Sequence, residues 1–160
     1  MRSSILILSM IALVCSVIIA APRTNAPQPD TQTPDESSSV RFMPFEVFIE
    51  TGDQPLAAYQ FEFVASDANA RVVGIEGGDH PAFKKPPYYD PKAMKNERVI
   101  VAAFSLNAPD SLPSGRVRIA TIHMMFTGDV PVKTTAKLKA CGTVGGMPIQ
   151  ATIDVPADNN

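Results

Sequence analysis

The sequence predicts an all-β protein with the architecture of an antiparallel β-sandwich. After the first 39 residues, apolar and polar residues alternate with period two in seven short runs, and clusters of glycine, proline, asparagine and aspartate separate these runs. No stretch shows sustained helical periodicity. Several short strands with turn signals between them are typical of a two-sheet sandwich. The expected strands cover residues 45–49, 59–63, 71–76, 99–106, 116–126, 132–140 and 148–155.

The first three runs each have one face suited to a core. The run "FEVFI" has an apolar residue at every second position. The run "YQFEF" directs three aromatic rings to one side and Gln60 and Glu62 to the other. The run "RVVGIE" ends at Gly77 and Gly78, where a turn is expected.

The later runs differ in how much of each strand they expect to bury. The run "VIVAAFSL" is apolar on both faces, which predicts a central strand, and "DPKAMKNE" before it allows one short helical turn. Both faces of "RVRIATIHMMF" carry apolar residues, which predicts a β-bulge near Ala120. The run "VKTTAKLKA" alternates cleanly with its lysines outward, and "PIQATIDV" gathers its aliphatic residues on one face.

The N-terminus has the pattern of an export signal. Arg2 supplies a positive charge, residues 5–20 are almost uninterruptedly apolar, and small residues follow at Ala20 and Ala21. We therefore expect a signal peptide at residues 1–20, cleaved between Ala20 and Ala21, and an extracytoplasmic mature protein. An uncleaved membrane anchor is one alternative, and lipid attachment at Cys15 is another. Contact with a membrane is expected only through such an N-terminal segment.

The remaining chain divides into a spacer, one domain and a short tail. Residues 21–39 contain no aromatic residue and no aliphatic residue larger than alanine, so we expect a disordered spacer. Residues 40–156 suit a single β-sandwich domain with one core, and residues 157–160 form a C-terminal tail. The net charge of −2 gives no basic face for nucleic acid, which we therefore exclude as a partner.

The two cysteines leave a single thiol in the mature chain. Cys15 leaves with the signal, so Cys141 has no internal disulfide partner and a cysteine-rich metal site is excluded. Continuing the alternation of "VKTTAKLKA" directs Cys141 outward, which predicts an accessible free thiol. The alternative is a strand that ends at Ala140, with Cys141 packed under the following turn as a small hydrophobic residue.

Three segments together resemble a known family of sandwiches. "FEVFIETGDQPLAAYQFEF", "ARVVGIEGG" and "SGRVRIATIHMMF" resemble the cohesin-like domains of exported bacterial proteins, which are grouped with the family 2 and family 3 carbohydrate-binding modules. The resemblance covers roughly residues 42–155. It implies a jelly-roll β-sandwich that binds a protein module or a polysaccharide without catalysis.

The sequence offers little support for an enzyme. There is no Gly-x-Ser-x-Gly elbow, and no histidine lies close to the lone cysteine in sequence. Glu76, Asp79 and His80, with Asp90 nearby, suggest either a cation or acid–base site or a polar turn in which Asp79 accepts backbone hydrogen bonds. We favour the turn, and we interpret His123 as a half-buried residue of a strand. No cofactor and no metal is expected.

The best candidate contact surface is the proline-rich stretch "HPAFKKPPYYDP". Its prolines limit the entropy lost on binding, and its tyrosines offer an apolar face with a polar tip. Adjacent residues of an extended chain point in opposite directions, so one tyrosine should pack inward while the other faces solvent. The alternative is a loop that only caps the end of the sandwich. The tentative ligand-binding residues are Phe83, Lys84, Lys85, Tyr88, Tyr89 and Asp90.

These observations rank three functions. The first is an exported, non-catalytic, cohesin-like domain that mediates a protein–protein interaction at the cell envelope or outside the cell. The second is a polysaccharide-binding module. The third is a structural envelope component without a discrete ligand. Aromatic rings aligned across one sheet face would favour a polysaccharide, whereas a mixed apolar and polar face would favour a protein.

Overall fold

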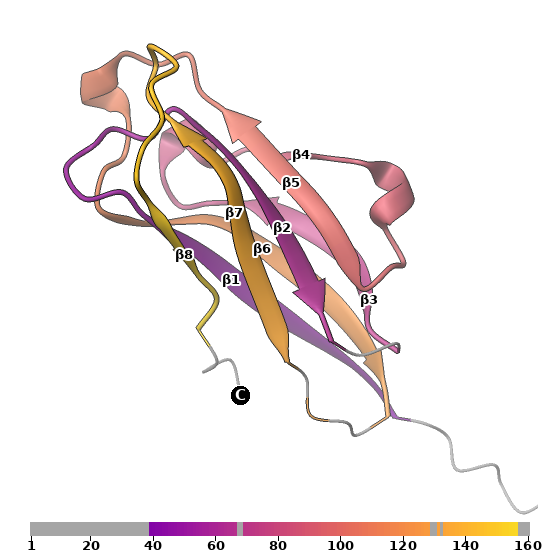
Figure 1. The fold of residues 1–160 in the computed structure, drawn as a ribbon. Helices are drawn as coiled ribbons and strands as arrows, with labels where there is room; N and C mark the ends of the chain where they lie inside the picture. Colours follow the sequence, from indigo (N-terminus) through magenta and orange to yellow (C-terminus); the bar gives the residue numbers. More distant parts are fainter. Residues whose placement is uncertain (1–38, 67–68, 129–130, 132, 157–160) are drawn as a thin grey trace, which may run out of the picture. The chain divides into compact units, whose positions relative to one another are not determined.

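The computed structural model describes residues 39–66, 69–128, 131 and 133–156. The expected signal, nearly all of the spacer and the C-terminal tail lie outside these residues. The described chain is all-β, with eight strands in two four-stranded antiparallel sheets (Figure 1). The strands are β1 (Val40–Glu50), β2 (Ala58–Ala65), β3 (Arg71–Gly77), β4 (Tyr88–Tyr89), β5 (Arg98–Phe104), β6 (Arg116–Thr127), β7 (Thr134–Gly142) and β8 (Thr152–Asp154).

The chain changes sheet at nearly every connection. Sheet A has the order β3-β6-β1-β8 and sheet B the order β4-β5-β2-β7, so only β4 and β5 are consecutive strands of one sheet. Three short 3₁₀ helices lie in the connections, namely η1 (Pro81–Phe83), η2 (Pro91–Ala93) and η3 (Pro109–Ser111). The helical turn expected after Asp90 is thereby confirmed as η2. No helix in the described part of the chain is long and apolar enough to cross a membrane.

The core lies between the two sheets and is built by the predicted alternation. Phe45 of β1 meets Phe63 of β2 with ring centroids 5.9 Å apart, and Phe126 of β6 at 6.1 Å. Val47 and Ile49 of β1 are fully buried beside them. Each such side chain contributes roughly 1.5–3 kcal/mol when it leaves water, so the aromatic strands of both sheets dominate the stability of the fold.

The predicted bulge in the long strand is present. Val47 pairs with Ala120 and Phe48 with Arg118, which leaves Ile119 as the extra residue of β6. The bulge changes which face each following side chain occupies, so residues 119–122 are all buried. The hydroxyl of Tyr59, from sheet B, donates a hydrogen bond of 3.0 Å to the carbonyl of Ile119 in sheet A.

A second bulge overturns the prediction for Cys141. Gln60 pairs with Ala140 and Phe61 with Leu138, so Lys139 is an extra residue in β7. The insertion reverses the alternation, and Cys141 turns inward and is buried. The prediction of an outward thiol was therefore wrong, because it assumed an unbroken period of two. Burial also raises the pKa of the Cys141 thiol.

Two further strands differ from the sequence prediction in extent. The tyrosine pair forms a two-residue strand, β4, that the sequence did not predict. The final run is regular only at Thr152–Asp154, although its aliphatic residues face the core as expected. The strand β5 lies between β4 and β2, as predicted for an interior strand, but its outer face is partly open at Ile100 and Phe104.

Candidate functional site

The two tyrosines of the proline loop, defined as residues His80–Pro91, point in opposite directions as predicted. Tyr88 has 68% of its surface exposed, whereas Tyr89 is half-buried and packs against the core. Phe83 is buried and meets the ring of Tyr59 edge-on, with centroids 5.2 Å apart. The loop therefore caps the core through Phe83 and Tyr89 while presenting Tyr88 to solvent.

Two adjacent glycines let the proline loop lie close to the sheets. The amide of Gly78 donates a 2.9 Å hydrogen bond to the carbonyl of Phe83. A Cβ atom at Gly77 would overlap the carbonyl oxygen of Lys84, and one at Gly78 would overlap that of Arg118. Both positions thus require glycine for close backbone approach.

Side-chain caps fix the two 3₁₀ turns of the loop. The Nδ1 atom of His80 accepts from the amide of Ala82 at 3.2 Å, and the Asp90 carboxylate accepts from the amide of Lys92 at 2.9 Å. Capping groups of this kind replace hydrogen bonds that the turn leaves unmade. The position of Tyr88 is therefore set by a stiff frame rather than by its own contacts alone.

Tyr88 forms an exposed aromatic pair with Phe104. The two rings are nearly parallel, at 9°, with centroids 5.9 Å apart. Phe104 is 57% exposed and lies at the end of β5. The pairing arises from register, because Tyr88 lies opposite Ala102 and Phe104 projects from the same face two residues later. We call Tyr88 and Phe104 the aromatic pair.

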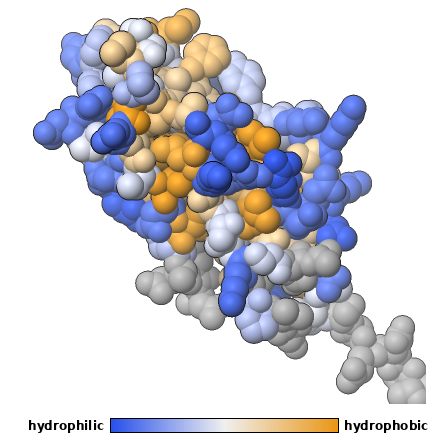
Figure 2. Space-filling view, viewed as in Figure 1, coloured by the Kyte–Doolittle hydropathy of each residue, from blue (hydrophilic) through white to orange (hydrophobic). Residues whose placement is uncertain are grey.

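Small residues beside the aromatic pair leave a hollow in the outer face of sheet B. One cross-strand row runs through Ala102, Gln60 and Ala140, and the next runs from Phe104 through Ala58 to Gly142. The result is a groove of about 470 Å³, here called the sheet groove, bounded on its far side by residues 143–148. Figure 2, viewed from the side of sheet B, shows apolar surface between hydrophilic side chains.

A second groove lies on the other side of the aromatic pair. This loop groove, of about 490 Å³, runs between the proline loop and residues 105–107. Lys85, Pro86 and Pro87 line it on one side, and Leu106, which is 88% exposed, lines it on the other. The aromatic pair is thus the wall shared by two apolar hollows.

A small ionic cluster lies in the row next to the sheet groove. The Glu62 carboxylate on β2 accepts from Arg98 on β5 and from Lys139 on β7, the latter at 2.5 Å. Hydrogen bonds from Lys139 and Arg98 hold the pKa of Glu62 below its usual value. Glu62 is therefore ionised at neutral pH and tethers three strands on the outer face.

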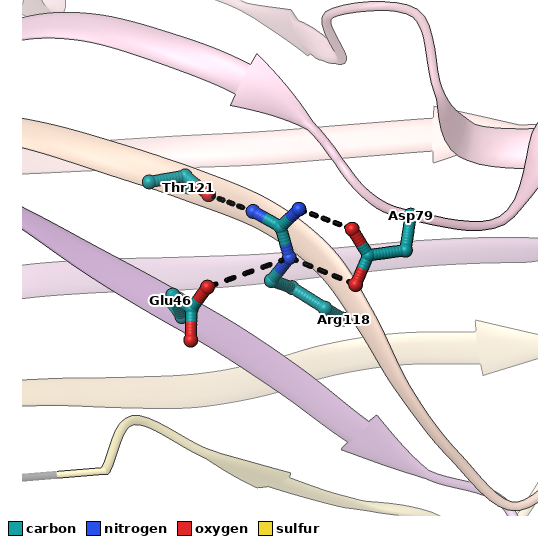
Figure 3. A network of polar contacts seen from close by, with 4 residues as sticks. All are labelled: Glu46, Asp79, Arg118 and Thr121. Atoms are coloured by element: carbon teal, nitrogen blue, oxygen red, sulfur yellow. Dashed lines mark hydrogen bonds and ion pairs between the residues drawn. The ribbon is translucent and has the colours of Figure 1, made fainter.

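The polar residues predicted near the turn after β3 separate into two contacts on sheet A. Asp79 binds the guanidinium of Arg118 through both carboxylate oxygens, and that same guanidinium contacts Thr121 and lies 3.6 Å from Glu46 (Figure 3). The Asp79 side chain thus accepts from Arg118, and the expected backbone hydrogen bonds to it are not what the structure shows. The bidentate contact lowers the pKa of Asp79.

The other members of the predicted acidic cluster lie apart from Asp79. Glu76 Oε1 is 3.0 Å from Nε2 of His123, which is half-buried as predicted. His80 and Asp90 cap separate turns. Within the ranges that the structure describes, no three histidine, cysteine, aspartate or glutamate side chains are grouped to hold a metal ion.

The structure unites only part of the predicted ligand-binding set. Tyr88 and Lys85 lie at the grooves, whereas Phe83 and Tyr89 belong to the core side of the loop. Lys84 lines a separate hollow with Asp79 and Arg118. Asp90 caps η2. Sequence reasoning missed Phe104 and the alanines of the groove floor, although period two in "VIVAAFSL" directs Phe104 outward.

Comparison of the chain with protein-family models, with curated proteins and with solved structures found no match.

Proposed function

We propose that this protein is an exported, non-catalytic binding domain that recognises another protein through the outer face of sheet B. The observation that carries the proposal is the aromatic pair, which stands exposed between two apolar grooves on a stiff frame. An exposed aromatic wall beside a hollow of small residues is the arrangement of an interface anchor, because burying it on association removes apolar surface from water.

The chemistry of the sheet groove supports binding rather than catalysis. Its titratable lining groups are Tyr59, Tyr88 and Cys141. Burial raises the pKa of Tyr59 and of Cys141, so both stay protonated at neutral pH. A protonated thiol is a poor nucleophile, and neither group has a neighbouring base in this lining.

The cohesin-like jelly roll is the finer fold that we propose within the all-β class. Two sheets of four strands and a chain that alternates between them support this assignment, because eight strands in two sheets is the arrangement of a jelly roll. The same family includes protein-binding and polysaccharide-binding members. A single aromatic pair, rather than a row of rings along the sheet, favours the protein partner.

Substitution of the two tyrosines tests the proposal. Tyr88→Ala should leave the free energy of unfolding unchanged and weaken capture of the partner at least tenfold, a loss of roughly 1.4 kcal/mol. Tyr89→Ala should instead destabilise the fold by about 2 kcal/mol, since its half-buried ring contributes less than a fully buried one. Phe42→Ala is a control, because Phe42 is an exposed ring of sheet A.

The screen uses the full mature chain as bait in the secreted and envelope fraction of the source organism, beside a glycan array. A protein retained by the Phe42→Ala variant and lost with Tyr88→Ala would support the proposal. Retention by both variants would refute this site. Tyr88-dependent binding to a glycan would establish the polysaccharide-binding alternative. Absence of any ligand in both screens would favour the structural envelope component.

Export is part of the same proposal and has its own test. The charged, apolar and small-residue sequence of positions 1–21 supports cleavage between Ala20 and Ala21. N-terminal sequencing of the protein from its source should begin at or near Ala21. An intact Met1 on a cytosolic species would refute export, and an intact Met1 in a membrane fraction would establish the anchor.

A further inference from the structure

Basic residues are unevenly distributed between the two sheets. The strands of sheet A carry four basic and four acidic residues, whereas those of sheet B carry three basic and one acidic. All the basic residues in the strands of sheet A are arginines, and every lysine that the structure describes lies in sheet B or in a loop. The positive excess therefore lies on the side of the molecule that holds the grooves.

The two sheets also differ in how their charges are neutralised. On sheet A, Arg118 binds Asp79 and Arg116 lies 3.3 Å from Asp154. On sheet B, two cations share the single carboxylate of Glu62. Lys85 and Lys137 form no ion pair with any of the residues described here. A net positive potential therefore remains on the outer face of sheet B.

The unneutralised lysines lie on opposite sides of the aromatic pair. Lys85 lines the loop groove. Lys137 lies opposite Glu62 in the register of β7 with β2, in the row next to the floor of the sheet groove. A ligand anchored on Tyr88 and Phe104 would thus have a cation within reach in either direction along its length.

We propose that the partner is an acidic, apolar polypeptide segment whose apolar side chains enter the sheet groove while its carboxylates face Lys85 and Lys137. This inference rests on the proposed function and adds the chemistry of the partner to it. Complementary charge at the border of an apolar contact raises the association rate and excludes basic partners. The grooves are concave and floored by alanines, so they receive single side chains, whereas a bilayer surface would need protruding apolar residues.

Synthetic peptides test the inference on the full mature chain. The probe is a dodecapeptide in which glutamate and leucine alternate, and the matched control replaces each glutamate with glutamine. We expect the acidic peptide to bind at least tenfold more tightly at about 50 mM salt, with most of that advantage lost at about 500 mM. Fluorescence anisotropy of labelled peptides measures both affinities.

Variants then locate the contact. Lys85→Glu and Lys137→Glu should each weaken binding of the acidic peptide about fivefold, the effect of roughly 1 kcal/mol at an exposed ion pair. Lys92→Glu is the matched control, because Lys92 is an exposed lysine that lines neither groove, and its affinity should stay within about twofold. Thermal unfolding of each variant checks that the fold is intact.

Three outcomes would overturn the inference. Equal binding of the glutamine peptide, lost in Tyr88→Ala, would reject the acidic partner while leaving the proposed groove in place. Stronger binding to phosphatidylglycerol vesicles than to phosphatidylcholine vesicles, without peptide binding, would assign the basic face to a membrane. Failure of both peptides and both vesicles to bind would reject the partner chemistry, and the Tyr88-dependent capture experiment judges the proposed function separately.

Discussion

Replacing Tyr59 with phenylalanine removes one oxygen atom from the interior and tests how the two sheets are joined. The Tyr59 ring is 3% exposed, and its hydroxyl reaches across the core to the carbonyl of Ile119. Ile119 is the extra residue of the β6 bulge, so the ladder with β1 skips it. The Tyr59→Phe variant keeps the ring and its packing and deletes only this hydrogen bond.

The expected cost is larger than that of an average hydrogen bond. A typical intramolecular bond contributes about 1 kcal/mol net, and leaving a buried partner unsatisfied costs roughly 1–3 kcal/mol. Because the Ile119 carbonyl lies in the interior and water is excluded from it, we expect Tyr59→Phe to lower the free energy of unfolding by about 2 kcal/mol.

Urea unfolding followed by circular dichroism measures the difference. Tyr88→Phe is the matched control, since the same atom is deleted from an exposed ring and the stability should change by less than about 0.5 kcal/mol. A Tyr59→Phe variant as stable as this control would refute the view that the bulge depends on the cross-sheet hydrogen bond.

The same residue predicts an alkaline limit to stability. Burial raises the pKa of Tyr59 above the ordinary tyrosine value of about 10. The native state therefore keeps a proton that the unfolded chain releases, so the stabilisation is complete below about pH 10 and decreases as pH rises further. The loss approaches about 1.4 kcal/mol per pH unit. This contribution should be absent from Tyr59→Phe, and equal alkaline slopes in the two proteins would contradict it.

Further predictions concern the turn after β3 and the buried thiol. Gly78→Ala should destabilise the fold by more than about 2 kcal/mol because its Cβ would overlap the backbone of Arg118, whereas Gly145→Ala, at an open position, should be nearly neutral; unfolding curves compare them. Cys141 should react with a thiol reagent only after denaturant is added, and rapid labelling of native protein would contradict its burial. Asp79→Asn should reduce the small loss of stability seen as pH falls below about 4, since pairing lowers the pKa of Asp79 in the folded state only; an unchanged acid titration of stability would count against this contact.

The sequence predicted the strands and the first bulge because these features depend on local alternation. Apolar residues on both faces of β6 indicated a shift of register near Ala120, and the extra residue is Ile119. The second bulge left no such mark, because Lys139 is polar on a strand whose outer face is already rich in lysine. Its consequence, the inward turn of Cys141, was therefore not predictable from period two alone.

The candidate site could be predicted only in part for a similar reason. Adjacent tyrosines in extended chain must diverge, which identified one exposed ring without saying which. The contact between Tyr88 and Phe104 depends instead on the register of β4 against β5, and β4 is only two residues long. The floor of the sheet groove depends on alanines and a glycine drawn from three strands, which no local pattern brings together.

The alternation of the chain between sheets has a consequence for the kinetics of folding. The first strand, β1, pairs over its whole length with β6, so that Val40 meets Thr127. Forming that ladder closes a loop of most of the domain, and the entropy of closure must be lost before the contacts form. Proteins dominated by such distant contacts fold in milliseconds to seconds rather than microseconds. A nascent or truncated chain that ends before Arg116 lacks the partner of β1, so its apolar N-terminal strand stays unpaired until β6 is available.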